Sequence, residues 1–102
     1  LEDSLMELLI DATRTYSVDR ITRTVKSGKR ILRESTVDTL YLDHYFGDLE
    51  TGSDLIKWAQ QKKLLPEQVV LVSISPSGRA DMARLLSNAG YQSADGIHFL
   101  RW

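Results

Sequence analysis

Two apolar runs that end abruptly in polar residues limit what this chain can fold into more than any other feature. Residues 37–43 lead into His44, and residues 69–73 lead into Ser75 and Arg79. Short apolar runs bounded by turn-forming residues are typical of buried strands. A helical pattern follows each run, and strands that alternate with helices predict a mostly parallel α/β sheet. Ligands of such sheets bind in the crevice beyond the carboxyl ends of the strands.

The first part of the chain predicts two further strands. Residues 5–10 form a short apolar run that stops at Asp11, and residues 19–25 alternate between apolar and polar side chains. Alternation of this kind is typical of a half-buried strand. The connection between these strands, residues 11–18, is too short for an ordinary crossover helix. We therefore expect a small three-layer sheet in which the first crossover helix is missing.

Three helices and a terminal hairpin complete the expected order. The helices are predicted over residues 27–34, from Thr51 or Ser53 to residue 63, and from Ser77 or Gly78 to residue 88. Asp95-Gly96 is a strong signal for a two-residue turn that joins residues 91–94 to residues 97–102 in a hairpin. The expected fold class is thus α/β, with a mostly parallel sheet and a C-terminal β-hairpin.

Length, charge and cysteine content restrict the class of protein. The 102 residues predict one domain over residues 1–102, with residues 1–5 expected to be partly upstream sequence because Met6 directly precedes the first strand. A net charge of −1 gives no global attraction to nucleic acid or to a membrane surface. The chain has no cysteine, which excludes disulfides and thiolate metal sites and favours a cytoplasmic protein. No apolar run approaches the ~20 residues that a membrane helix needs.

A carboxylate and a histidine follow the third predicted strand. Histidine exchanges a proton near neutral pH, and a nearby carboxylate can orient its ring. Asp43 and His44 are therefore candidates for acid–base chemistry. Adjacent strand residues point to opposite faces, so the two side chains cooperate only if the backbone turns there. The structural alternative is a strand-end Asp43 that caps local amides, with His44 packed in a polar corner.

Arginine and serine side chains near the strand ends suit a phosphate ligand. A planar guanidinium can hold phosphate through two parallel hydrogen bonds, and helix N-termini attract anions. Small residues let a phosphate approach the backbone closely. The alternative is a set of solvated arginines and an ordinary serine-capped turn into a helix. The candidate phosphate-binding residues are Arg14, Arg23, Ser73, Ser75, Gly78 and Arg79.

These motifs together resemble the cyclic-phosphate processing receiver domain family. The resemblance covers nearly the whole chain from Met6. In chain order the matching motifs are Ile10-Asp11-Ala12-Thr13-Arg14, Arg23-Thr24, Leu42-Asp43-His44-x-x-Gly47, Thr51-Gly52 and Ser73-x-x-Pro76-x-Gly78-Arg79-x-x-Met82. The family patterns they match run roughly LDDxR, an Arg-Thr pair, LDHDLG, TG and HSMNPxGRxxM.

The resemblance implies a receiver-like, flavodoxin-like fold with a phosphate-binding cleft at the strand ends. An active member would be a phosphoesterase that processes cyclic phosphate ends of nucleotides or RNA. His44 would act as general acid/base, Asp43 would orient it or bind metal, and Thr24 would join the ligand-binding set. The expected partner is a phosphorylated small molecule or an RNA end. Phosphoacceptor receivers hold magnesium with an acidic pair, and here Asp11 and Asp43 would hold it only weakly.

Departures from the family patterns support a second hypothesis. Ala12, Tyr45 and Val72 stand where the patterns have two acidic residues and a histidine. The domain would then be a catalytically eroded receiver-like module that binds a protein partner or senses a ligand. Its C-terminal strand could pair with a second copy through an exposed edge, which predicts a homo-oligomer.

Overall fold

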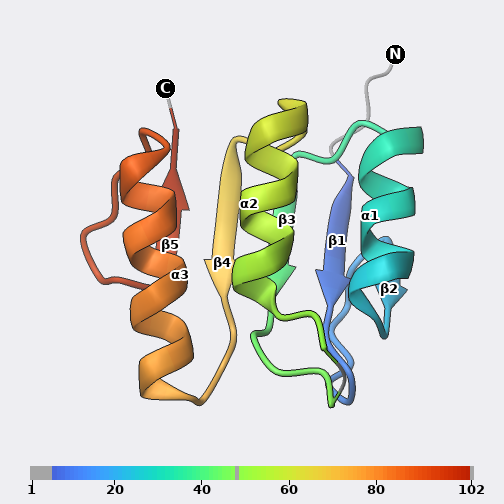
Figure 1. Ribbon diagram of the computed structural model, residues 1–102. Coiled ribbons are helices and arrows are strands. Elements are labelled where there is room, and N and C mark those ends of the chain that lie inside the picture. The colour runs from blue at the N-terminus through green and yellow to red at the C-terminus, as the bar shows by residue number, and fades with distance from the viewer. Residues whose placement is uncertain (1–5, 48, 102) are drawn as a thin grey trace.

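The computed structural model describes residues 6–47 and 49–101, which form a five-stranded sheet and three helices (Figure 1). The elements in chain order are β1 (Glu7–Ile10), β2 (Arg20–Thr22), α1 (Val25–Glu34), β3 (Thr39–Leu42), α2 (Gly52–Lys62), β4 (Gln68–Leu71), α3 (Pro76–Asn88) and β5 (His98–Leu100). This order confirms the predicted alternation of strands and helices. No helix in the described part of the chain is long and apolar enough to cross a membrane.

The strand order β2-β1-β3-β4-β5 decides where a ligand site can form. The first four strands run parallel, and β5 pairs antiparallel with β4. From β1 the chain moves toward one edge of the sheet to form β2, whereas from β3 it moves toward the other edge to form β4. Open α/β sheets bind ligands where the direction switches, which here is between β1 and β3. Asp11 and Asp43 directly follow these two strands.

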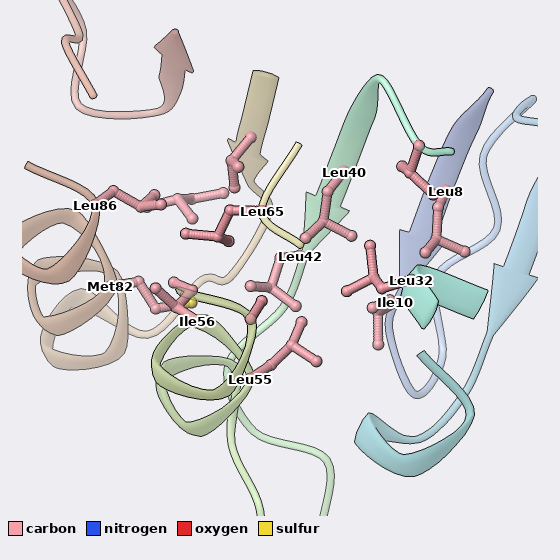
Figure 2. Close-up of a cluster of buried hydrophobic side chains, with 14 of the residues drawn as sticks. Leu8, Ile10, Leu32, Leu40, Leu42, Leu55, Ile56, Leu65, Met82 and Leu86 are labelled. Carbon is pink, nitrogen blue, oxygen red and sulfur yellow. The ribbon is translucent and has the colours of Figure 1, made fainter. Parts of the chain in front are cut away.

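All three helices cover the same face of the sheet (Figure 1). Crossovers between parallel strands are right-handed, and the connections through α1 and α2 move in the same direction across the sheet. Both helices therefore pack on one side. The strand residues that point to this side form one core with the helices (Figure 2), which includes Leu8, Ile10, Leu32, Leu40, Leu42, Leu55, Ile56, Met82 and Leu86.

The connection from β1 to β2 contains no helix, as predicted. The described residues therefore form two layers, where three were expected. A helix in this connection would have covered the second face of the sheet. The connection itself covers part of that face. Its Tyr16 packs edge-on against Tyr41 of β3, with ring centroids 5.8 Å apart. Leu9 of β1 lies next to Tyr41 in the sheet and is fully buried.

The start of α1 differs from the prediction. Val25, which was expected in a strand, is the first helical residue and packs in the core with the helices. Thr24 rather than Ser27 caps the helix, since its hydroxyl oxygen accepts a hydrogen bond from the Ser27 amide at 3.0 Å. Gly28 consequently lies inside the helix, where a Cβ atom would overlap the Ile10 side chain.

The predicted C-terminal hairpin is reduced to a single bridge between Gln92 and Leu100. The Asp95 carboxylate accepts hydrogen bonds from the amides of Ile97 and His98, both at 2.8 Å, and so orders the loop without a regular strand ladder. His98–Leu100, which includes the bridge residue Leu100, pairs with β4 as β5. Two amides of β5, those of His98 and Leu100, are thereby bonded within the chain.

A close contact at the start of α2 gives a first test of this packing. A Cβ atom at Gly52 would overlap the carbonyl oxygen of Asp43 and lie 2.7 Å from the Met82 sulfur. We expect Gly52→Ala to lower the free energy of unfolding by about 1–3 kcal/mol, although alanine is the better helix former. Urea unfolding measures the change. Gln60→Ala, at an exposed position of the same helix, should change it by less than about 0.5 kcal/mol, and equal effects would contradict the contact.

Candidate functional site

A fully buried carboxylate, that of Asp11, lies at the end of β1. Its Oδ1 accepts hydrogen bonds from the amides of Thr13 at 2.9 Å and Arg14 at 3.0 Å. Its Oδ2 accepts one from Arg14 Nη1 at 2.6 Å. Burial alone would raise the pKa of Asp11, but these hydrogen bonds outweigh burial and the pKa lies below its ordinary value of 3.8. The carboxylate is therefore held in its charged form.

Arg14 links the carboxylates of Asp11 and Asp43 at the switch point, the place between β1 and β3 where the strand order changes direction. The same nitrogen that donates to Asp11 lies 3.5 Å from Asp43 Oδ2. The hydrogen bond to Asp11 raises the pKa of the guanidinium, and the charge of Asp43 adds to the effect. The structure thus brings together three of the predicted site residues, with a cation already placed between two acids.

This arrangement does not fit the magnesium ion of phosphoacceptor receivers. Magnesium needs several oxygen ligands in near-octahedral geometry, and here both oxygens of Asp11 are used by Arg14 and by backbone amides. Within residues 6–47 and 49–101, no group of three or more His, Cys, Asp or Glu side chains could hold a metal ion. The weak magnesium site expected at Asp11 and Asp43 is therefore replaced by the Arg14 contact.

Arg23 and Thr24 hold the backbone around this contact. Arg23 Nη1 donates to the carbonyl oxygens of Asp11, at 3.2 Å, and of Arg14. Its Nη2 donates to the Thr15 hydroxyl at 3.0 Å. These bonds fasten the helix-free connection to the end of β2. Thr24 caps α1, and its hydroxyl accepts a hydrogen bond from the Ser27 amide in the first turn of that helix.

His44 lies buried between the starts of α2 and α3. The residue is only 6% exposed, and Nε2 lies 3.0 Å from the Ser53 hydroxyl oxygen. The Asp43 carboxylate accepts a hydrogen bond from the His44 amide at 2.8 Å, and the hydrogen-bond partner of the ring is Ser53 rather than Asp43. A Cβ atom at Gly78 would lie 2.6 Å from Nδ1, which explains why a glycine stands there. Nδ1 is buried and has no hydrogen-bond partner among the described residues.

Serine hydroxyls order the turn from β4 into α3. Ser75 caps the helix by accepting from the Gly78 amide at 3.2 Å, two residues before the predicted start at Ser77, because Pro76 fits the first helical position. The buried Ser73 hydroxyl accepts from the Ser75 amide at 3.1 Å. Arg79 Nη1 donates to the Ser73 carbonyl at 3.1 Å.

An open depression beside this turn has a volume of ≈ 380 Å³. Arg79 and Pro76 line it on the α3 side, and residues 95–97 line it on the other. Arg79 is the cation of this depression, whereas Arg14 is the cation at the switch point. The predicted arginines thus belong to separate parts of the same sheet edge.

Sequence reasoning missed two residues near His44, namely Ser53 and Asp81. Ser53 bonds the ring, and its hydroxyl lies near the carboxyl of Asp81. The nearby Ser53 hydroxyl, together with the hydrogen bond from Arg84 at 2.6 Å, holds the pKa of Asp81 below its ordinary value of 3.8. Neither residue lies in a strand-end motif. Only the packing of α2 against α3 brings them together, so no local signal could have identified them.

Residues 6–88, well over half of the chain, match the family described as the cyclic-phosphate processing Receiver domain. The chain belongs to this family. The expected family membership is thereby confirmed. Among solved structures it is similar to the MaeR response regulator bound to beryllium trifluoride, with 16% identity and a TM-score of 0.59 over 71% of this chain and 69% of that one. At this identity the likeness confirms the receiver fold alone. No curated protein matches the chain.

The Asp11 hydrogen bonds make a pH-dependent contribution to the stability of this receiver-like domain. Asp11→Asn should lower the free energy of unfolding at pH 7 by about 2 kcal/mol, because a charged acceptor is lost from a buried site. A depressed folded-state pKa means that the contribution is fully present above the unfolded pKa, near 3.8, and is lost as the pH falls through the folded value. Urea unfolding at pH 7 and pH 3 should therefore show a smaller difference at pH 3.

The exposed Glu34 provides a matched control for this prediction. Glu34→Gln should change the free energy of unfolding by less than about 0.5 kcal/mol at either pH. A difference between Asp11→Asn and the wild type that stays constant from pH 7 to pH 3 would contradict the assigned role of the Asp11 charge.

Proposed function

We propose that this domain binds cyclic phosphate esters of nucleotides or RNA ends at the carboxyl edge of the sheet and hydrolyses them. One observation carries the proposal. Three adjacent strands, β1, β3 and β4, are followed at this edge by Arg14, by His44 and by the N-terminus of α3. A cation, a proton-exchanging ring and a helix N-terminus are the groups that phosphoester hydrolysis uses. Membership of the family adds support.

In the proposed reaction, water attacks phosphorus and one bond of the cyclic diester breaks, which leaves a phosphate monoester. His44 Nδ1, which has no hydrogen-bond partner among the described residues and is buried beside Gly78, would take the proton of the attacking water once the start of α3 moves away from it. The proton then passes to the oxygen that leaves phosphorus. Asp43 accepts the His44 amide, so its part would be to fix the backbone of this histidine.

Arg14 would stabilise the negative charge that grows on the phosphoryl oxygens. It is held at the switch point by Asp11 and Asp43, where it would supply the positive charge that a metal ion supplies in phosphoacceptor receivers. Arg79 and the first turn of α3, at the neighbouring part of this edge, would hold the rest of the substrate, with Ser73 and Ser75 ordering the turn. Arg23 and Thr24 would contribute through the scaffold they form. We propose that the reaction needs no added magnesium. The lack of cysteine fits the reducing cytoplasm, where we place the protein.

Incubation with 2′,3′-cyclic nucleotides and cyclic-ended RNA tests this function. We expect turnover that is unchanged by a chelator, and His44→Gln should reduce it by at least about 10²-fold because a glutamine cannot take the proton. Glutamine keeps a polar group for Ser53, so the fold should survive, and urea unfolding checks it. Gln60→Ala, an exposed change on α2, should leave the rate unaltered. Turnover that survives His44→Gln, or no turnover at all, would refute the proposal.

The second candidate function is a binding module without turnover. Arg14, Arg23 and Arg79 donate hydrogen bonds to side-chain and backbone oxygens of the chain itself, which favours an ordered but inactive site. Such a module would bind a cyclic nucleotide, or a protein partner, without releasing product.

Calorimetry and light scattering separate this candidate from the enzyme. Cyclic-nucleotide binding without product formation would support the module, and a strict monomer with turnover would contradict it. A dimer through the outer edge of β5 would compete with the bonds that already hold the His98 and Leu100 amides. A second copy is therefore better accommodated elsewhere on the molecule.

A further inference from the structure

The basic side chains of this chain are unevenly distributed. Residues 20–33 hold six of the 13 lysines and arginines and none of the 14 aspartates and glutamates. The rest of the chain is therefore acidic, although the net charge of the whole is −1. A surface patch of one sign attracts a ligand of the opposite charge even when the net charge is near zero.

Four of these cations form a stripe on α1, because they follow the three- and four-residue spacing that places side chains on one face of a helix. The members of this α1 basic stripe are Lys26, Lys29, Arg30 and Arg33. Lys26, Arg30 and Arg33 are exposed, and none of them forms an ion pair within residues 6–47 and 49–101. Lys29 is half-buried, and its Nζ lies 2.7 Å from Glu50 Oε1. The stripe therefore presents three cations to a ligand.

The α1 basic stripe begins at the carboxyl edge of the sheet, where the proposed site lies. α1 directly follows the carboxyl end of β2, so its first turn lies at this edge (Figure 1). Arg23, just before the helix, donates to the backbone carbonyl oxygens of Asp11 and Arg14 and so ties the start of α1 to the switch point. From there the stripe leads away along α1, and Lys26 to Arg33 cover about 10 Å of its axis.

An aromatic ring lies beside the stripe. Trp58 of α2 is half-buried, and the centre of its ring lies 5.4 Å from Lys29 Nζ and 5.8 Å from Arg33 Cζ. Both distances are within the range of a cation–π contact. Surfaces that bind single-stranded nucleic acid combine cations for the phosphates with aromatic rings for the bases. This combination favours RNA over an acidic peptide, which has no base to stack. The apolar face of α1 packs in the core, so it is not available to enter a membrane.

We infer that the α1 basic stripe binds the strand of a single-stranded RNA whose cyclic end lies at the switch point, so that cyclic-ended RNA is preferred over a free cyclic nucleotide. Lys26, Arg30 and Arg33 contact phosphates of the strand, and Trp58 offers its exposed part to a base. The place of the cyclic end rests on the proposed function, whereas the binding of RNA to the stripe does not.

Fluorescence anisotropy with a labelled single-stranded RNA of about ten nucleotides tests the stripe. The RNA ends in a 3′-phosphate, a monoester that the proposed reaction cannot hydrolyse. Three phosphate contacts predict a slope of about −2 when the logarithm of the binding constant is plotted against that of the salt concentration, so binding should weaken about 15-fold between about 50 and 200 mM salt. Lys26→Gln combined with Arg30→Gln should weaken binding at least about tenfold at 50 mM salt and make the slope shallower by about 1.4.

Lys57→Gln combined with Arg84→Gln is the matched control, since it removes one lysine and one arginine charge from exposed positions on α2 and α3. This variant should bind the RNA within about twofold of the wild type, because salt screens charges outside the binding surface. Equal losses in the two double variants, or a wild type that binds no RNA, would overturn the inference. A polyglutamate peptide that binds the wild type as tightly as the RNA would also overturn it, because the partner would then be an acidic protein.

Turnover measurements separate this inference from the proposed function. The value of kcat/KM for cyclic-ended RNA should exceed that for a 2′,3′-cyclic mononucleotide, and their ratio should fall about tenfold in the α1 double variant. RNA binding to the stripe without hydrolysis would refute the proposed function alone. Hydrolysis with the same ratio in the wild type and the α1 double variant would refute this inference alone.

Discussion

The buried Asp11 carboxylate is the interaction on which the rest of the site depends. A charge in a fully buried position is stable only when its hydrogen bonds replace those of water, and Asp11 obtains them from Thr13, the Arg14 amide and the Arg14 guanidinium. These bonds fold the chain into a tight turn directly after β1. The same turn carries Arg14 to Asp43 and presents backbone carbonyls to Arg23. A single charged group thus orders the connection that lacks a helix.

Close approach of the helix starts to the strand ends is the second constraint. Gly52 and Gly78 stand where a Cβ atom would overlap the Asp43 backbone or the His44 ring. The missing side chains let α2 and α3 begin directly against the residues that follow β3. This closeness buries His44 and makes Ser53 its hydrogen-bond partner. The starts of α2 and α3 therefore determine the contacts of the His44 ring, whereas the neighbouring Asp43 lies next to Arg14.

Sequence reasoning was most successful where a local signal decides the outcome. The capping residues Thr51 and Ser75 lie within two residues of the predicted helix starts, and the helix-free connection follows from its length. It failed at residues 19–25, where alternation continued past the end of the strand because Val25 packs in the core as part of a helix. It also predicted a longer hairpin than the structure has. The side chain of Asp95 accepts hydrogen bonds from the loop amides that a strand ladder would use.

The sequence by itself determined the α/β class, the family and the edge of the sheet at which the polar residues gather, because apolar period, turn residues and motif spacing are local properties. Only the tertiary structure decided what those residues contact. Arg14 stands between two carboxylates, Arg23 bonds carbonyls twelve and nine residues away, and Ser53 bonds the ring of His44 nine residues before it. Such contacts depend on strand order and helix packing. Hydrogen bonds and ion pairs act over a few ångströms in space, whatever the distance along the chain.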